Sequence, residues 1–95
     1  MPYQKKKPHP MTYYLITNKE TGWYFCNKST HPQASARHHF SRAKNPMRKD
    51  YNCQFYQDIR KYGEDGFTIE YSLELPSTVS RRAHYIAPSE VENDN

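Results

Sequence analysis

The chain of 95 residues is long enough for one small domain and too short for two. A mean hydropathy of -1.16 argues against a membrane span, and the 9 tyrosines must supply core volume that Leu, Ile and Val supply elsewhere. The net charge of +4 understates the basic character of the body, since the C-terminal end is acidic; this favours a polyanionic partner, although a solvated basic surface fits the composition equally well.

The ends of the chain differ in composition from its middle. Residues 1–10 combine prolines with a lysine run, which predicts a flexible basic arm and lacks the apolar segment of a signal peptide. Residues 11–87 are expected to form the domain, and residues 88–95 an acidic disordered tail. We therefore expect an intracellular protein. Cys26 and Cys53 are expected to be free thiols, because a single optional disulfide is not the disulfide framework that is typical of small secreted proteins.

The first half of the domain predicts a hairpin and a helix. Thr12–Thr17 and Trp23–Cys26 are aromatic and β-branched runs, which is typical of strands. The loop between them ends in Gly22, which supplies the positive φ of a bulged turn. Pro32 suits the first turn of a helix, and this helix is expected to run to about Lys44.

A second helix follows near Asn52–Tyr62, after a loop around Pro46. Phe55, Ile59 and Tyr62 recur at i, i+4 and i+7, which places them along one side of this helix. Gly63 is expected to end the helix in the left-handed conformation.

The last elements predict the fold class. Apolar and polar residues alternate from Phe67 to Leu75, as in a strand with one apolar face, and Val79–Ile86 is interpreted as a short last helix. The order β-β-α-α-β predicts an α+β fold, with a small three-stranded antiparallel sheet flanked by helices.

Three segments carry recognisable motifs. Thr12–Lys19 contains Tyr14 and a turn, Tyr24–Cys26 begins with a tyrosine, and Ile59–Glu70 contains Arg-Lys-Tyr-Gly before a strand. Together they resemble the GIY-YIG nuclease superfamily, and in particular its small phage-type homing endonucleases. The resemblance spans Met11 to Leu75 and implies a GIY-YIG-like fold.

The resemblance also implies a chemistry, namely Mg²⁺-dependent hydrolysis of a phosphodiester bond by an activated water. Tyr14 and Tyr24 would be the catalytic tyrosines, and Arg37 would stabilise charge on the phosphate. His39, with His38, is a displaced candidate for the histidine that the family often carries one helical turn after the arginine. The basic residues expected to contact nucleic acid are Lys28, Arg42, Lys44, Arg48, Lys49, Arg60 and Lys61.

The chain also departs from the family. Arg82 occupies the position expected for the metal-binding glutamate, and a cation cannot bind Mg²⁺. Glu70 and Glu74 are the remaining candidates for metal ligands, although surface carboxylates explain both. The spacing from Tyr14 to Tyr24 is one residue short.

Three functions fit these residues. The first is a degenerate nuclease fold that binds nucleic acid, with DNA favoured, or another phosphate-bearing partner without efficient cleavage. The second is an active endonuclease that uses Mg²⁺ and a relocated carboxylate. The third is a reused nuclease fold that binds a host protein or a signalling nucleotide.

Overall fold

The two aromatic runs near the start of the domain form an antiparallel hairpin. In the computed structural model, which describes residues 11–77, 79 and 83–88, β1 (Thr12–Asn18) pairs with β2 (Tyr24–Ser29). Gly22 has a φ of 82° in the connecting turn. The Asn18 side-chain oxygen accepts the backbone N–H groups of Glu20 and Thr21, at 2.8 and 3.2 Å. The predicted hairpin and its glycine turn are confirmed.

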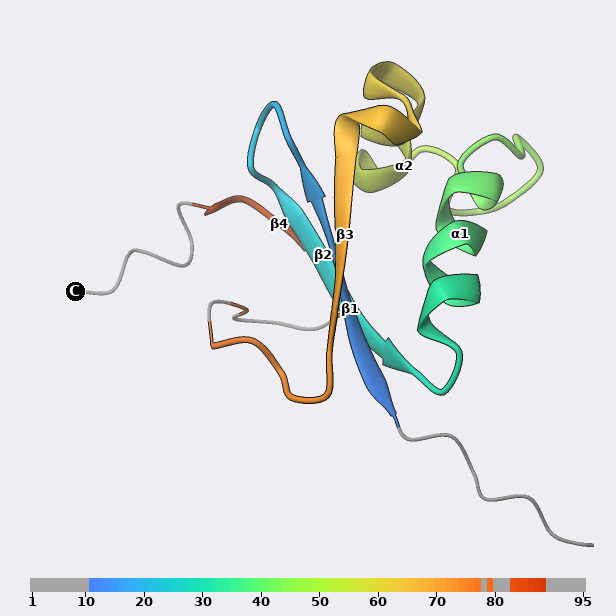
Figure 1. Ribbon diagram of the computed structural model, residues 1–95. Helices are drawn as coiled ribbons and strands as arrows, with labels where there is room; N and C mark the ends of the chain where they lie inside the picture. Colours follow the sequence, from blue (N-terminus) through green and yellow to red (C-terminus); the bar gives the residue numbers. More distant parts are fainter. Residues whose placement is uncertain (1–10, 78, 80–82, 89–95) are drawn as a thin grey trace, which may run out of the picture.

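The sheet has four strands in the order β3-β1-β2-β4, rather than the three expected (Figure 1). β3 (Phe67–Ser72) pairs with β1, and β4 (Tyr85–Ile86) pairs with β2. The prediction of a short last helix over Val79–Ile86 is therefore wrong for Tyr85 and Ile86, which form a strand. Pairing with β2 satisfies backbone groups of that edge and buries Ile86 to 2% exposure, which an isolated helical turn would not achieve.

Both helices lie on the same side of the sheet (Figure 1). α1 (Pro32–Arg42) begins at the expected proline and ends slightly before Lys44, while α2 (Gln54–Tyr62) begins two residues after Asn52. Gly63 ends α2 as expected, but its φ of 79° and ψ of 165° differ from the left-handed helical conformation. This backbone region is essentially restricted to glycine. A single 3-10 turn, η1 (Glu64–Gly66), then leads into β3.

The sheet has a hydrophobic cluster on each face. On the helix side, Tyr14, Ile16 and Phe25 pack with residues of α1 and α2, including Phe40 and Phe55. On the opposite side, Tyr24 and Cys26 of β2 pack with Ile86 of β4 and with Val79, which lies between β3 and β4. Cys26 is buried and Cys53 is exposed, and the two cysteines do not form a disulfide bond with each other.

The β3 strand is shorter than the alternation predicts. Its last residue, Ser72, pairs with Tyr13 near the start of β1, so β1 provides almost no further partner for the residues beyond it. Leu73 and Leu75 are consequently exposed, at 68% and 44%. Apolar alternation continues past the point where the sheet ends.

Some expectations fall partly or wholly outside the described residues. These are the basic arm at 1–10, the tail apart from Pro88, and Arg82 at the expected glutamate position. Within the described residues, no helix has the length and apolar character needed to cross a membrane.

Candidate functional site

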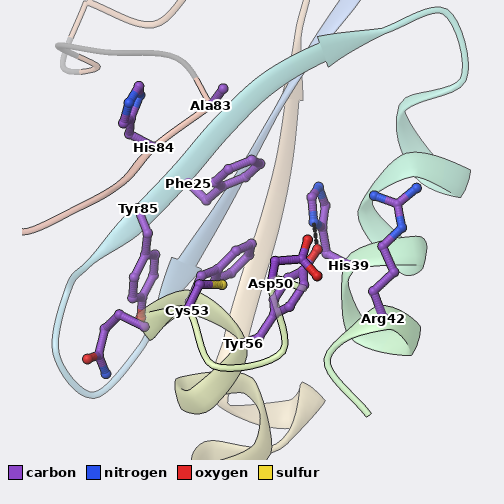
Figure 2. A pocket seen from close by; sticks show the side chains of 11 residues that line it. Phe25, His39, Arg42, Asp50, Cys53, Tyr56, Ala83, His84 and Tyr85 are labelled. Carbon is purple, nitrogen blue, oxygen red and sulfur yellow. Dashed lines mark hydrogen bonds between the residues drawn. The ribbon is translucent and has the colours of Figure 1, made fainter. Parts of the chain in front are cut away.

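A pocket of about 440 Å³ opens where β2, the end of α1, the start of α2 and the chain before β4 meet (Figure 2). Aromatic rings make up much of its wall, and polar side chains come from α1 and from the loop between the helices. The lining residues are Phe25, His39, Arg42, Asp50, Cys53, Gln54, Phe55, Tyr56, Ala83, His84 and Tyr85.

A hydrogen-bonded chain of three side chains lies at this pocket. The Tyr14 hydroxyl from β1 is 3.1 Å from Nε2 of His39, and Nδ1 of the same imidazole is 3.0 Å from the Tyr56 hydroxyl. A neutral imidazole has one donor and one acceptor nitrogen, so one tyrosine hydroxyl must donate to His39 and the other must accept from it. The imidazole is thereby fixed in orientation by β1, α1 and α2 together.

Burial keeps the members of this chain uncharged. Burial, together with the nearby Arg42 guanidinium, lowers the pKa of His39 to about 4. Burial raises the pKa of Tyr14 to about 12. At neutral pH neither group is suited to deprotonate a water molecule, because an efficient general base needs a pKa near the working pH. The chain can orient a ligand or a water, and it is poorly suited to general-base catalysis.

Tyr24 is not brought to this site. It pairs with Thr17 and Ile86, and its side chain belongs to the cluster on the opposite face of the sheet. Side chains alternate along a strand, and Tyr24 lies three residues from Asn27, the partner of Tyr14, so the two tyrosines face opposite sides of the sheet. Phe25 takes the place facing the helices, with its ring 4.8 Å from that of His39.

Arg37 also lies away from the pocket. It is exposed on α1 and lines a separate depression with His38, Ser41, Lys44 and Glu64. The residue one helical turn before His39 is Ser35, whose hydroxyl donates to the Ser29 hydroxyl at 2.8 Å. The arginine-then-histidine spacing expected from the resemblance is therefore absent, and the arginine that lines the pocket is Arg42.

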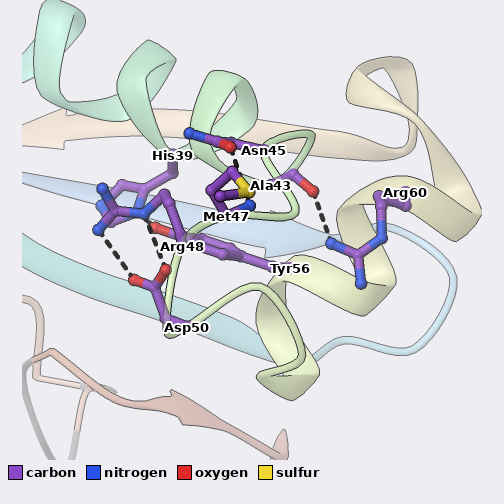
Figure 3. A network of polar contacts seen from close by, with 8 residues as sticks. All are labelled: His39, Ala43, Asn45, Met47, Arg48, Asp50, Tyr56 and Arg60. Atoms are coloured by element: carbon purple, nitrogen blue, oxygen red, sulfur yellow. Dashed lines mark hydrogen bonds and ion pairs between the residues drawn. The ribbon is translucent and has the colours of Figure 1, made fainter.

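Several of the residues predicted to contact nucleic acid instead interact with other residues of the protein. Arg48 forms a bidentate ion pair with Asp50, with hydrogen bonds of 2.8 and 3.2 Å (Figure 3). Arg60 donates a hydrogen bond to the Ala43 carbonyl at the end of α1. The Arg60 guanidinium also lies 3.8 Å from the centre of the Tyr51 ring. Arg60 is thus a packing residue that joins α2 to the loop after α1.

The remaining predicted contacts are more exposed. Lys44 is 3.9 Å from the carboxylate of Glu64, and Lys61 lies 5.1 Å from the centre of the Tyr62 ring. Lys28 and Lys49 are exposed, the first on β2 and the second in the loop before Asp50. Arg42 is exposed as well and is the member of the set that lines the pocket.

The candidate metal ligands do not fit a magnesium site. Glu70 pairs with Leu15 on the face of the sheet away from His39, and Glu74 is exposed beyond the end of β3. Asp50 is the acidic residue of the pocket wall, and its hydrogen bonds to Arg48 hold its pKa below the usual range. Among the described residues, no group of three or more His, Cys, Asp or Glu side chains is placed to hold a metal ion. Mg²⁺ needs oxygen ligands that converge, and the described residues do not supply them here.

A second polar network, which the sequence analysis missed, fixes the far wall of the pocket. The Tyr85 hydroxyl donates to the buried Asp58 carboxylate at 2.7 Å, and the Gln54 amide donates to the same carboxylate at 2.7 Å. The Asn18 amide donates to the Tyr85 hydroxyl at 3.2 Å. Burial raises the pKa of Tyr85. The spacing of Gln54 and Asp58 on one helix face was the available signal, but their partners come from β1 and β4.

Comparison of the chain with family models, with curated proteins and with solved structures finds no match.

Proposed function

We propose that this protein is a degenerate GIY-YIG-like scaffold that binds nucleic acid, or another phosphate-bearing partner, without efficient cleavage. The observation that carries the proposal is the pocket at His39, which combines an exposed arginine with hydrogen-bonding side chains and has no converging carboxylates among the described residues. Such a site can hold an anion. It is not equipped to activate a metal-bound water.

Two features support binding at this face. Arg42 lies beside His39 and Tyr56 at the wall of the pocket, where its guanidinium can donate two hydrogen bonds to one phosphate (Figure 2). Exposed lysines continue from Arg42 through the loop between the helices, at Lys44 and Lys49, whereas Arg48 in the same loop is paired with Asp50. Since the body of the chain is basic, this face suits a polyanion better than a neutral ligand.

Two features argue against efficient hydrolysis. The tyrosine expected to act with Tyr14 is on the other face of the sheet, and a phenylalanine, Phe25, stands in its place. Burial lowers the pKa of His39 to about 4, which makes the imidazole a weak base, and raises the pKa of Tyr14 to about 12, so its hydroxyl stays protonated at neutral pH. Binding and orientation remain as the roles that these side chains can perform.

Fluorescence anisotropy with a labelled oligonucleotide at several salt concentrations tests the binding. Arg42→Ala should weaken binding roughly fivefold at low salt, equivalent to about 1 kcal/mol, and should reduce the slope of log affinity against log salt by about 0.7 to 0.9. Arg37→Ala is the matched control, because it removes the same charge from the same helix outside the pocket. Equal effects of the two variants would show that general charge, not this site, governs binding.

A plasmid-nicking assay in Mg²⁺ or Mn²⁺ tests the second half of the proposal. We expect no metal-dependent nicking above that of a Tyr14→Phe variant. Nicking that depends on metal and disappears in Tyr14→Phe would contradict the proposal and establish the alternative, an active endonuclease.

A further inference from the structure

The outer edge of β3 presents backbone groups that the sheet does not use. β3 forms one edge of the sheet, with β1 as its neighbour on the inner side (Figure 1). The Lys19 N–H donates to the Gly66 carbonyl at 2.8 Å, in continuation of the register between β1 and β3. In an antiparallel strand, alternate residues bond to the same neighbour. Ile69 and Tyr71 therefore point their N–H and C=O groups outward, where no backbone group of the described residues bonds to them.

This edge lacks the features that usually keep edge strands from pairing with other chains. Natural sheets block their edges with proline, lysine, bulges or very short strands. β3 has 6 residues, contains neither proline nor lysine, and pairs with β1 without a bulge. Its single charged residue, Glu70, lies on the face of the sheet away from α1. Tyr71 is 43% exposed, and Leu73 just beyond the strand is exposed as well. The edge is therefore open to an added strand.

Cations stand above the same edge, on the side of the sheet that the helices cover. Arg37 lies nearly opposite His39 around α1, since the two positions are about half a turn apart. His39 contacts Phe25 of β2, so Arg37 is on the side of α1 that faces β3. Lys44 is 3.9 Å from the Glu64 carboxylate, directly before β3, and lines one depression with Arg37 and Glu64.

We infer that the β3 edge binds an extended acidic segment of a partner protein as a further strand of the sheet. Its backbone would pair with Ile69 and Tyr71, and its acidic side chains on the helix side would meet Arg37 and Lys44. Side chains on the other side of the segment would lie beside Glu70, which disfavours acidic residues there. The segment should therefore alternate acidic and neutral residues. This surface is separate from the pocket at His39, and its partner does not depend on the proposed function.

Two other occupants fit this edge less well. A second copy of the chain, paired strand to strand about a two-fold axis, would bring its own Arg37 and Lys44 toward those of the first, and like charges repel. Nucleic acid would satisfy the cations. Its phosphate oxygens only accept hydrogen bonds, however, so they would leave the outward carbonyls of β3 without a donor. An acidic peptide matches both the charges and the backbone.

NMR titration of the ¹⁵N-labelled protein tests the inference with two capped peptides of equal composition. In one peptide glutamate and threonine alternate, and in the other all the glutamates precede the threonines. We expect the alternating peptide to shift the amide signals of Ile69 and Tyr71 and to slow their hydrogen exchange, because both N–H groups become bonded. The second peptide has the same charge without the alternation and should bind about fivefold more weakly.

Tyr71→Pro and Tyr71→Ala form a matched pair of variants. Both remove the exposed ring, but only proline removes the outward N–H, and an edge strand tolerates proline at such a position. Tyr71→Pro should bind the alternating peptide about fivefold more weakly than Tyr71→Ala does, the equivalent of one net hydrogen bond. N-methylation of the peptide at alternate residues repeats the test on the unmodified protein. Methylation in one of the two possible phases should abolish binding, and in the other it should not.

Four results would overturn the inference. Equal binding of the two peptides, or equal binding by Tyr71→Pro and Tyr71→Ala, would show that charge alone is recognised. Absence of any shift of the Ile69 and Tyr71 amides would show that the edge binds no such segment. If sedimentation finds a dimer that Tyr71→Pro dissociates, a second copy occupies the edge. If an oligonucleotide shifts the same amides and displaces the peptide, the edge belongs to a nucleic-acid surface.

Discussion

Acidification is expected to destabilise the folded protein, because His39 must give up its buried neutral state to accept a proton. Burial is the largest cause of its lowered pKa. Arg42, His38 and Arg48 lower the pKa further, while the Asp50 carboxylate opposes them. In the unfolded chain the imidazole returns to an ordinary pKa of 6.5. The folded state therefore resists protonation over the interval in which the unfolded state accepts it.

The sign and size follow from this difference. A pKa that is lower in the folded state gives stability that is fully present above pH 6.5 and is lost as the pH falls toward about 4. In that interval the unfolded chain binds up to one proton more than the folded protein, so the free energy of unfolding falls by about 1.4 kcal/mol per pH unit. The total loss is about 3 kcal/mol, which is a large share of the stability of a small domain.

Urea unfolding at several pH values between neutral and pH 4, followed by the fluorescence of Trp23, measures this loss. Trp23 is the single tryptophan and its ring is 5.1 Å from that of Tyr85, so its emission should report the folded state. A His39→Gln variant keeps a donor and an acceptor but cannot titrate, and its stability should vary much less with pH over this interval. His38→Gln, at the neighbouring exposed position, should retain the pH dependence of the unmodified protein.

The result that would refute this reasoning is an equal pH dependence in the unmodified protein and in His39→Gln. It would mean that His39 is solvated in the folded state and that the hydrogen-bonded chain does not hold it neutral.

Three further predictions concern the groups that shape the site. Tyr85→Phe should lower the free energy of unfolding by about 2 kcal/mol, because it removes a hydrogen bond from a buried carboxylate, whereas Tyr71→Phe at an exposed position should change it by less than about 0.5 kcal/mol; urea unfolding of both variants measures the difference. Gly63→Ala should cost about 1–3 kcal/mol, although nothing lies within 4 Å of the added Cβ, because the backbone conformation disfavours any side chain; an unchanged melting temperature would contradict this. Arg60→Ala should lower the melting temperature through lost packing and hydrogen bonding, while Arg37→Ala, which removes the same charge from an exposed site, should not; equal melting temperatures would show that Arg60 is only a surface charge.

The sequence predicted the local features of the fold well. The turn at Gly22, the helix start at Pro32 and the helix end at Gly63 each depend on the backbone preferences of one residue and its neighbours, and each is found where expected. The α+β class followed from the order of the elements. The fourth strand was missed because β4 has only two residues and gains its stability from pairing with a distant strand, which no local pattern reports.

The site was predicted less completely. Tyr14 and His39 are brought together from positions 25 residues apart, whereas Tyr24 and Arg37 are placed elsewhere. Counting the register from Gly22 would have shown that Tyr24 lies on the other face, since strand side chains alternate strictly. The choice between Arg37 and Arg42 depended on which side of α1 meets the sheet.

By itself, then, the amino-acid sequence determined the turn at Gly22, the start of α1 at Pro32, the end of α2 at Gly63, and that the body of the domain is basic. Only the tertiary structure decided which side chains meet at the site, because Asn18, Asp58 and Tyr85 form one hydrogen-bond network across separations of up to 67 residues. Along a strand, moreover, a single register step moves a side chain to the other face of the sheet. Local backbone preferences act between neighbours, while burial and hydrogen bonding in the pocket act between elements that the fold brings together.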